Sequence, residues 1–322
     1  MAVHSGEILF VKSVKDGIPN RDPLNESDAR RIFGEEDGRI SLSDVSIKRD
    51  VRDYVLAKYP DGGPNKRFFI FCREERTDEG KLLGRESLAK KIMERAGLAG
   101  KSASRETLLQ YAYDMRIFGA VYSVQKESFH QTGPVQFGWA HSLHPVETKY
   151  VQGTVVMPSE DIKPNEKGEE QGRQQGTIWT TYILPFVVFA MPGVINGPIA
   201  SDTKVDDTDI DLLLEGLWRG TQHRQARGRG IQQPLLLVHV EYSDPFFRIG
   251  YLEDHIRLEP GREAWLGGTP PTSVQDVTLD VSGLGVLLAN AQNSGKLARV
   301  RYWKNANLEM TGDIPGTQCE EW

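Results

Sequence analysis

Apolar residues recur at helical spacing in two stretches of the chain, and each stretch predicts a helix that buries one face. The first helix runs from a cap at Ser41, Ser43 or Asp44 to about residue 58, and its apolar positions are Ile47, Val51, Tyr54 and Val55. The second begins at 206–208, and its apolar positions are Ile210, Leu213, Leu214, Leu217 and Trp218. Since residues three and four apart share a helix face, both helices should face the core.

Apolar runs between turn residues predict the strands, at residues 8–14, 67–72, 117–124, 135–140, 182–195 and 235–240. Residues 76–130 read as a largely helical insertion, with one helix marked by Leu88, Ile92 and Ala96 and another by Leu108, Leu109, Ala112 and Met115. Residues 157–176 are polar and rich in proline and glycine, as in an exposed loop or a hairpin tip. No strong periodic segment follows Leu258.

The order of the elements indicates the fold class. With the insertion set aside, it is strand, helix, strand, strand, helix, strand, which is the order of a ferredoxin-like α+β fold. RNA-recognition domains share this architecture. Because one fold carries many functions, the order alone does not predict RNA binding.

Composition narrows the class of protein. The chain has 322 residues, 39% of them hydrophobic and 26% charged, which is typical of a globular protein with a sizeable core. Its two cysteines, Cys72 and Cys319, are far apart and lack metal-ligand spacing, so we expect no disulfide, metal or cofactor and a cytoplasmic location. Neither a membrane-spanning run nor a signal peptide is recognisable.

A net charge of −6 argues against a general nucleic-acid binder unless basic groups gather on one face. The first predicted helix offers such a face, since Lys48 and Arg52 are four residues apart and Arg49 lies beside them. Serines at its start add donors where the helix dipole favours an anion. This surface suits a phosphate backbone. The alternative is a solvated helix face with Arg49 and Arg52 paired to Asp50 and Asp53.

A second basic element follows the second predicted helix. Residues 219–230 hold four arginines and no acidic residue: Arg219, Arg224, Arg227 and Arg229. Cations are favoured at a helix C-terminus, which explains Arg219 and in part Arg224. Arg227 and Arg229 lie instead in a glycine-rich stretch, where the backbone can approach a ligand closely, and they favour a polyanion.

Motifs for catalysis are weak. The sequence has no P-loop, no strand-linked G-x-G-x-x-G, no G-x-S-x-G and no H-E-x-x-H. Asp16, Asp22 and Asp44 could hold a divalent cation for phosphodiester cleavage, but turn formation and helix capping also account for them. We therefore predict that the chain is not an enzyme.

Five segments together resemble the CRISPR-associated Cascade backbone family, the "Cas seven" or DevR group, and most closely its type I-B and I-C branches. They are 16–23 (DGIPNRDP), 43–54 (SDVSIKRDVRDY), 114–121 (DMRIFGAV), 133–136 (GPVQ) followed by Ser142 and Pro145, and Arg227-Gly228 before the last core strand. They occur in the family's order between about residues 8 and 240.

The resemblance implies an RNA-recognition-like palm at 1–75, 117–145 and 182–245. It also implies a helical fingers insertion at 76–116, a thumb hairpin at 146–181 and a C-terminal extension at 246–322. Several copies would stack along a guide RNA (crRNA) beside other Cascade subunits, and each thumb would interrupt the duplex of guide and target DNA. Val156 or Met157 is the candidate wedge of that thumb.

The resemblance assigns guide contacts to Lys48, Arg49 and Arg52, and less firmly to Arg21, Ser43 and Gln136; the basic loop adds Arg224, Arg227 and Arg229. The aromatic motif of RNA-recognition domains is missing from residues 235–242, so binding should follow the RNA backbone. Two alternatives stay open. One is a metal-dependent RNA endonuclease of type III-like complexes that uses Asp16 or Asp22, and the other is a domain that binds no RNA.

Overall fold

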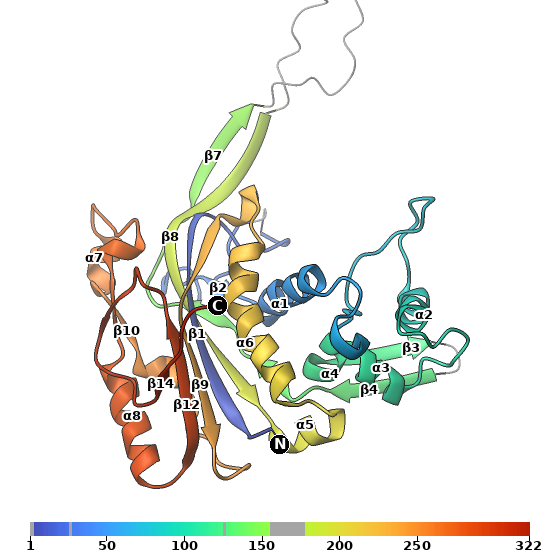
Figure 1. The fold of residues 1–322 in the computed structure, drawn as a ribbon. Coiled ribbons are helices and arrows are strands. Elements are labelled where there is room, and N and C mark those ends of the chain that lie inside the picture. Colours follow the sequence, from blue (N-terminus) through green and yellow to red (C-terminus); the bar gives the residue numbers. More distant parts are fainter. Residues whose placement is uncertain (1–2, 26–27, 125–126, 155–177) are drawn as a thin grey trace, which may run out of the picture.

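The structure, a computed structural model, describes residues 3–25, 28–124, 127–154 and 178–322 (Figure 1). Its largest sheet, among these residues, has the strand order β14-β12-β9-β1-β8-β6-β2, with β5 and β7 also paired to β8. The central strands are β1 (Gly6–Gly17), β8 (Ile178–Ile195) and β9 (Ile231–Tyr242). The predicted strands at 8–14, 182–195 and 235–240 are thus confirmed, and each is longer than predicted.

Alternation along β1 gives the sheet two apolar faces. β1 pairs antiparallel with both β8 and β9. Ile8 and Phe10 lie in one hydrophobic core, whereas Leu9 and Val11 lie in another. Since successive strand residues point to opposite sides, these are the cores of the two faces, and each needs its own covering layer.

Two helices cover the first face, which we call the helical face. They are α1 (Asp44–Lys58), with Ser43 at its N-cap, and α6 (Asp207–His223), capped by Asp206. α1 buries Ile47, Val51 and Val55, and α6 buries the five apolar residues that its sequence pattern marked. Both predicted helices are confirmed. The short α5 (Gly197–Thr203) precedes α6 and was not predicted.

The C-terminal part of the chain covers the second face, which we call the C-terminal face. It contains η3 (Leu252–His255), α7 (Arg262–Leu266), α8 (Ser282–Asn293) and a small sheet of β10 (Arg257–Glu259), β11 (Thr278–Asp280) and β13 (Glu309–Thr311). β12 (Leu297–Lys304) and β14 (Thr317–Gln318) extend the main sheet. Leu279, Leu284 and Leu288 pack in one core with Leu9 and Val11. The sequence pattern predicted none of these elements.

The predicted strand at 67–72 is wrong. After the 3₁₀ turn η1 (Pro64–Lys66), this segment forms a single bridge, between Phe69 and Ala112. Its apolar side chains are buried, but its backbone is satisfied elsewhere: the amides of Phe71 and Cys72 donate to the carboxylate of Asp114. An apolar run indicates burial, and here burial occurs without a sheet partner.

The insertion has a small core of its own. It contains α2 (Arg85–Arg95), α3 (Arg105–Tyr111), α4 (Tyr113–Phe118) and the two-stranded sheet of β3 (Gly119–Val124) and β4 (Glu127–Thr132). The predicted helix through Leu108 and Met115 is interrupted at Ala112, whose backbone is extended. The strand predicted at 117–124 begins at Gly119, and the one at 135–140 is divided into β5 (Val135–Phe137) and β6 (Ala140–Ser142). β6 pairs with the edge strand β2 (Ser41–Leu42).

A two-stranded hairpin projects beyond the body of the molecule (Figure 1). β7 (Lys149–Thr154) pairs antiparallel with the first part of β8, from Lys149 opposite Ile183 to Thr154 opposite Ile178. The proposed wedge residues Val156 and Met157 lie outside the described residues. Among the helices that the structure describes, none is long and apolar enough to cross a membrane.

Candidate functional site

A hollow of about 510 Å³ opens where the start of α1 meets the loop after α6 and the segment after residue 71. We call it the arginine hollow, because five arginines line it: Arg49, Arg52, Arg73, Arg224 and Arg229. Of the described residues that line it, one, Glu74, carries a carboxylate. The N-terminal end of α1 adds its dipole to the same space, since Ser43, Val45 and Ser46 also line it. This surface can receive an anion.

The two predicted basic elements are therefore brought together in space. Arg49 and Arg52 come from α1, and Arg224 and Arg229 come from the loop after α6, far along the chain. Arg49 is the more open of the α1 pair: its side chain is 42% exposed and its Nε lies 2.6 Å from Asp53 Oδ1. That ion pair is the one that the solvated-face alternative expected. An exposed ion pair is weak, so a phosphate can compete for the guanidinium.

Arg52 is held in the interior. Its side chain is 13% exposed, and its Nε donates to Asp114 Oδ2 at 2.9 Å. Burial disfavours the charged guanidinium, but Asp114 outweighs that effect and raises the pKa of Arg52. The predicted pairing of Arg52 with Asp50 or Asp53 is not observed, because Arg52 instead joins α1 to the insertion.

Lys48 shares a helix face with Arg52, as predicted. Both cations lie over the ring of Phe118, at 5.6 and 5.2 Å from its centroid. Lys48 is 12% exposed, and its Nζ lies 2.9 Å from Asp44 and 3.4 Å from Gln136 Oε1. Gln136 in turn donates to the carbonyls of Phe118 and Gly133. Neither Lys48 nor Gln136 lines the arginine hollow, and both fasten β5 to α1.

A buried carboxylate organises the loop side of the hollow. Asp50 on α1 is 1% exposed and accepts from Lys12 at 3.1 Å, Arg224 at 2.9 Å and Arg229 at 3.0 Å. Burial lowers the pKa of the Lys12 ammonium, although Asp50 acts in the opposite sense. Asp53 is a second carboxylate here, since its Oδ2 lies 3.2 Å from Arg224 Nε and its Oδ1 pairs with Arg49. Four cations around two carboxylates leave a positive excess beneath the hollow, which an external anion would offset.

Ser43 lines the hollow without capping α1 through its side chain. Its backbone N–H and its hydroxyl both donate to Asn20 Oδ1, at 2.9 and 2.8 Å. Asn20 belongs to the turn that follows β1, so this contact joins the predicted turn motif to the helix motif.

Arg21 and Arg227 do not line the hollow. Arg21 Nη2 donates to the carbonyls of Tyr182 and Gly228, at 3.1 Å each. Arg227 belongs to the 3₁₀ turn η2 (Arg227–Arg229), and its guanidinium carbon lies 3.7 Å from the centroid of the Trp179 ring. Arg21 thus contacts the hairpin near its base, whereas Arg227 contacts it at Trp179, one position from the far end of the described pairing.

Arg73 is a lining residue that the sequence analysis missed. Its side chain is 5% exposed and pairs with Glu75 at 2.5 Å, while its buried Nε has no hydrogen-bond partner. The backbone just before it is fixed by Asp114, which also holds Arg52. A signal existed, because residues 73–76 (REER) follow the apolar run directly. Residues 73–76 alone do not predict that Arg73 lines the hollow, because its position there depends on how the insertion folds back toward α1.

The carboxylates considered for metal binding have local roles. Asp22 accepts from the Leu24 amide at 3.0 Å, and Asp44 pairs with Lys48. Asp16 is the penultimate residue of β1 and has a positive φ of 57°. Within the part of the chain that the structure describes, no group of three or more His, Cys, Asp or Glu is placed to share an ion.

The fold and the hollow define a mixed α+β protein with an anion-receptive surface beside its first helix. The family model described as CRISPR-associated protein Cas7 matches residues 4–282, and the chain belongs to this family. The CRISPR-associated protein Cas7 of Haloferax volcanii is 26% identical over 305 residues, covering 88% of this chain and 82% of that protein. The family predicted from the five motifs is confirmed, whereas the type I-B or I-C branch stays a prediction.

Solved structures share the fold. One chain, from a CRISPR RNA-guided surveillance complex described as pre-nicking, superimposes with a TM-score of 0.58 at 15% identity and covers 99% of this chain and 96% of its own. Another, from a CRISPR RNA-guided surveillance complex, has a TM-score of 0.52 at 14% identity and covers 97% and 95%. The α+β architecture is therefore that of chains found in such complexes.

Proposed function

We propose that this protein is a guide-RNA-binding backbone subunit of a type I Cascade surveillance complex, and that the arginine hollow holds the guide's phosphates. The hollow carries the proposal: five arginines and the dipole of α1 face one carboxylate among the described lining residues. Phosphates would supply the negative charge that the four cations around Asp50 and Asp53 leave unbalanced. Family membership and the neighbours' RNA-guided complexes support the same function.

The proposal includes an RNA-recognition-like palm. The antiparallel order β9-β1-β8, followed by β5 and β6, with α1 and α6 on one face, supports it. The insertion would form the fingers and the β7–β8 hairpin the thumb. In an ordinary RNA-recognition domain the open sheet face binds RNA through aromatic residues. Here the C-terminal layer covers that face, so RNA would bind at the edge of α1.

Copies of the chain would follow one another along the guide in the cytoplasm. A contact between unlike surfaces does not close on itself, so it would produce a helical row limited by the length of the RNA. Target DNA would join through pairing with the guide, and other Cascade subunits would complete the particle. This arrangement predicts binding that weakens steeply with salt, because each neutralised phosphate releases counterions.

We further propose that the subunit does not cut RNA. The local roles of Asp22 and Asp44 support this. Assembled complex is incubated with complementary RNA and Mg²⁺, and the RNA should stay intact. Cleavage that disappears in Asp22→Ala would establish the endonuclease instead.

Arg49 is the sharpest probe of RNA binding. Lys48 and Arg52 are unsuitable, because both are part of the packing around Phe118. Arg49→Ala should weaken guide binding about tenfold or more, since hydrogen bonds to charged groups contribute about 1.5–3 kcal/mol. The slope of log affinity against log salt should fall by about 0.7 for each lost contact with single-stranded RNA.

Arg257→Ala is the matched control for Arg49→Ala. Arg257 is an exposed arginine on β10, in the C-terminal layer, so its replacement removes the same charge away from the hollow. It should leave affinity and slope unchanged. If both variants weaken binding equally, net charge rather than the hollow determines RNA binding and the proposed site is wrong.

A further inference from the structure

Strand β8 of the β7–β8 hairpin is fastened to the loop that carries the arginines, at Tyr182 near the hairpin base and at Trp179 farther out. The guanidinium carbon of Arg227 lies over the Trp179 ring, 3.7 Å from its centroid. Arg21 bridges the same two parts, because its Nη2 donates to Tyr182 O on the hairpin and to Gly228 O on the loop. One strand of the hairpin is thus tied to the loop by a cation–π contact and by a shared guanidinium.

The opposite strand of the hairpin is shaped to allow this stack. Gly153 on β7 is paired with Trp179 on β8. A Cβ atom on Gly153 would overlap the indole ring of Trp179. Glycine therefore lets the ring lie across β7 and meet Arg227. The contact between Trp179 and Arg227 therefore depends on both strands: β8 supplies the ring, and the glycine of β7 leaves space for it.

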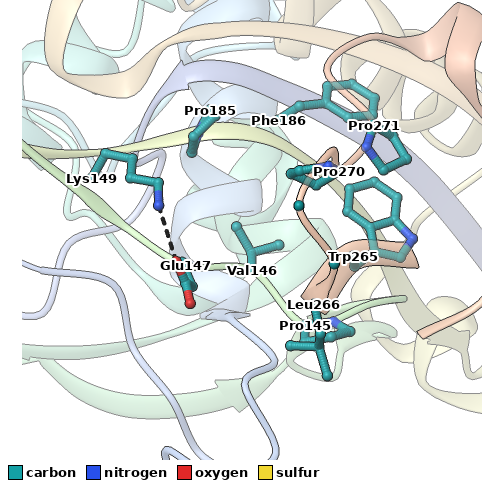
Figure 2. Close-up of a pocket in the computed structure, with 12 residues that line it drawn as sticks. Pro145, Val146, Glu147, Lys149, Pro185, Phe186, Trp265, Leu266, Pro270 and Pro271 are labelled. Atoms are coloured by element: carbon teal, nitrogen blue, oxygen red, sulfur yellow. Dashed lines mark hydrogen bonds and ion pairs between the residues drawn. The ribbon is translucent and has the colours of Figure 1, made fainter. Parts of the chain in front are cut away.

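A pocket lies beside the hairpin base, toward the C-terminal layer. It has a volume of about 320 Å³ and lies between Lys149 of β7, Pro185 and Phe186 of β8, and Trp265 and Pro271 near α7 (Figure 2). Phe186 and Trp265 belong to the core of the C-terminal face. Arg224 and Arg229, which flank Arg227 in the loop, bind Asp50 on the helical face. The contacts that hold β8 therefore come from the loop on the helical face, and just before the start of β7 Thr148 Oγ1 donates to Asp28 Oδ2 at 3.2 Å.

We propose that Trp179 and Arg227 are positioning residues, whose stack sets the angle at which the β7–β8 hairpin leaves the body. Arg227 then acts on the hairpin and is not a phosphate contact, which revises its predicted role. The loop that presents Arg229 to the arginine hollow also holds the hairpin. The hairpin would therefore keep a fixed position relative to the hollow. The consequence for RNA rests on the proposed function, whereas the effect on the hairpin does not.

Spin labels can measure the hairpin angle directly in the full chain. One label is placed by Thr154→Cys at the end of β7 and the other by Gln292→Cys on α8, both exposed, after Cys72→Ser and Cys319→Ser. The parent should give a single narrow distance distribution. Trp179→Ala and Arg227→Ala should each broaden it, and the double variant should be no broader than either, because both remove one contact.

Conservative variants separate positioning from loss of structure. Arg227→Lys and Trp179→Phe keep a cation and an aromatic face and should restore part of the narrow distribution. Gly153→Ala should broaden it by displacing the ring. Hydrogen exchange at the β7 and β8 amides should stay protected in every variant, which shows that the strand pairing persists. A distribution unchanged in both alanine variants overturns the proposal.

Measurements of guide-RNA binding provide a second test of the proposal. Arg227→Ala and Trp179→Ala should both leave the salt slope of guide binding unchanged. If Arg227→Ala lowers the slope by about 0.7 while Trp179→Ala does not, Arg227 contacts a phosphate and the reassignment is wrong. If the parent retains no guide RNA at all, the proposed function fails, and the spin-label distances still decide whether the stack sets the angle.

Discussion

The two faces of the central sheet are stabilised by different physical means. The helical face contains the buried charges Lys12 and Asp50 and opens at its edge into the arginine hollow. The core of the C-terminal face is mainly aliphatic and aromatic, and α8 and the small sheet cover it. Its buried carboxylate, Glu7, accepts from neutral donors: the Tyr242 hydroxyl and the amides of Ile249 and Gly250. The difference indicates where a polyanion can approach: the C-terminal layer closes one side of the sheet, and the arginines gather beside α1 on the other.

Removing Asp50, the carboxylate shared by the buried cations of the helical face, should lower the free energy of unfolding more than any other change predicted here. Asp50→Ala would leave Lys12, Arg224 and Arg229 without their shared carboxylate. Removing one partner of a buried ion pair costs about 3–5 kcal/mol. Urea denaturation should show a loss of that size. Glu86→Ala, which removes an exposed ion pair with Lys90 on α2, should cost about 0–1 kcal/mol, and equal losses would contradict the cluster's role.

A cavity in the C-terminal face should destabilise the protein without changing its affinity for RNA. Leu279 on β11 is fully buried, and Leu279→Ala should lower the unfolding free energy by about 2–5 kcal/mol. Guide affinity of the folded variant should equal that of the parent. Val286→Ala, at an exposed position of α8, should stay within about 0.5 kcal/mol. Weaker guide binding in Leu279→Ala would show that the C-terminal face contributes to the site.

Acid should weaken the C-terminal face through His144. Its ring stacks on Trp265 and its Nε2 accepts from the Val188 amide at 3.1 Å. Burial lowers the pKa of His144 to about 3. The unfolded chain takes up this proton near pH 6.5 and the folded chain does not, so stability is lost as pH falls from about 6.5 toward 3.

Through His144, the free energy of unfolding should fall by at most about 1.4 kcal/mol per pH unit. Between pH 6.5 and 5 the loss is about 2 kcal/mol. Denaturation of the parent and of His144→Gln at pH 7.5 and 5 isolates it from other titrating groups. The parent's advantage over the variant should shrink at pH 5. An advantage that is constant with pH would mean that His144 carries a proton in the folded state.

The sequence predicts the regular elements of the helical face because their periodicity is strong. Ile47, Val51 and Val55 repeat every four residues, and α1 follows. α8 has a comparable signal in Leu284, Leu288 and Ala291, but Gly283 and Gly285 obscure it. The three-residue strands of the small sheet are too short for any period to show.

The site is only partly predictable, because its composition depends on tertiary contacts. Arg49, Arg224 and Arg229 follow from basic patterns in the sequence, and the structure brings them together. Whether a cation faces solvent or a partner does not follow from those patterns: Arg52 is held by Asp114, and Arg227 lies on Trp179. Arg73 enters the hollow only because residues 67–73 fold without forming a strand.

Photocrosslinking tests the central claim most directly. A guide RNA that carries 4-thiouridine is bound to the full chain and irradiated, and the crosslinked peptides are identified by mass spectrometry. Crosslinks should fall in the segments that line the arginine hollow, at residues 19–20, 43–52, 72–74 and 224–229. Crosslinks concentrated in the C-terminal layer, at residues 257–311, would contradict the account.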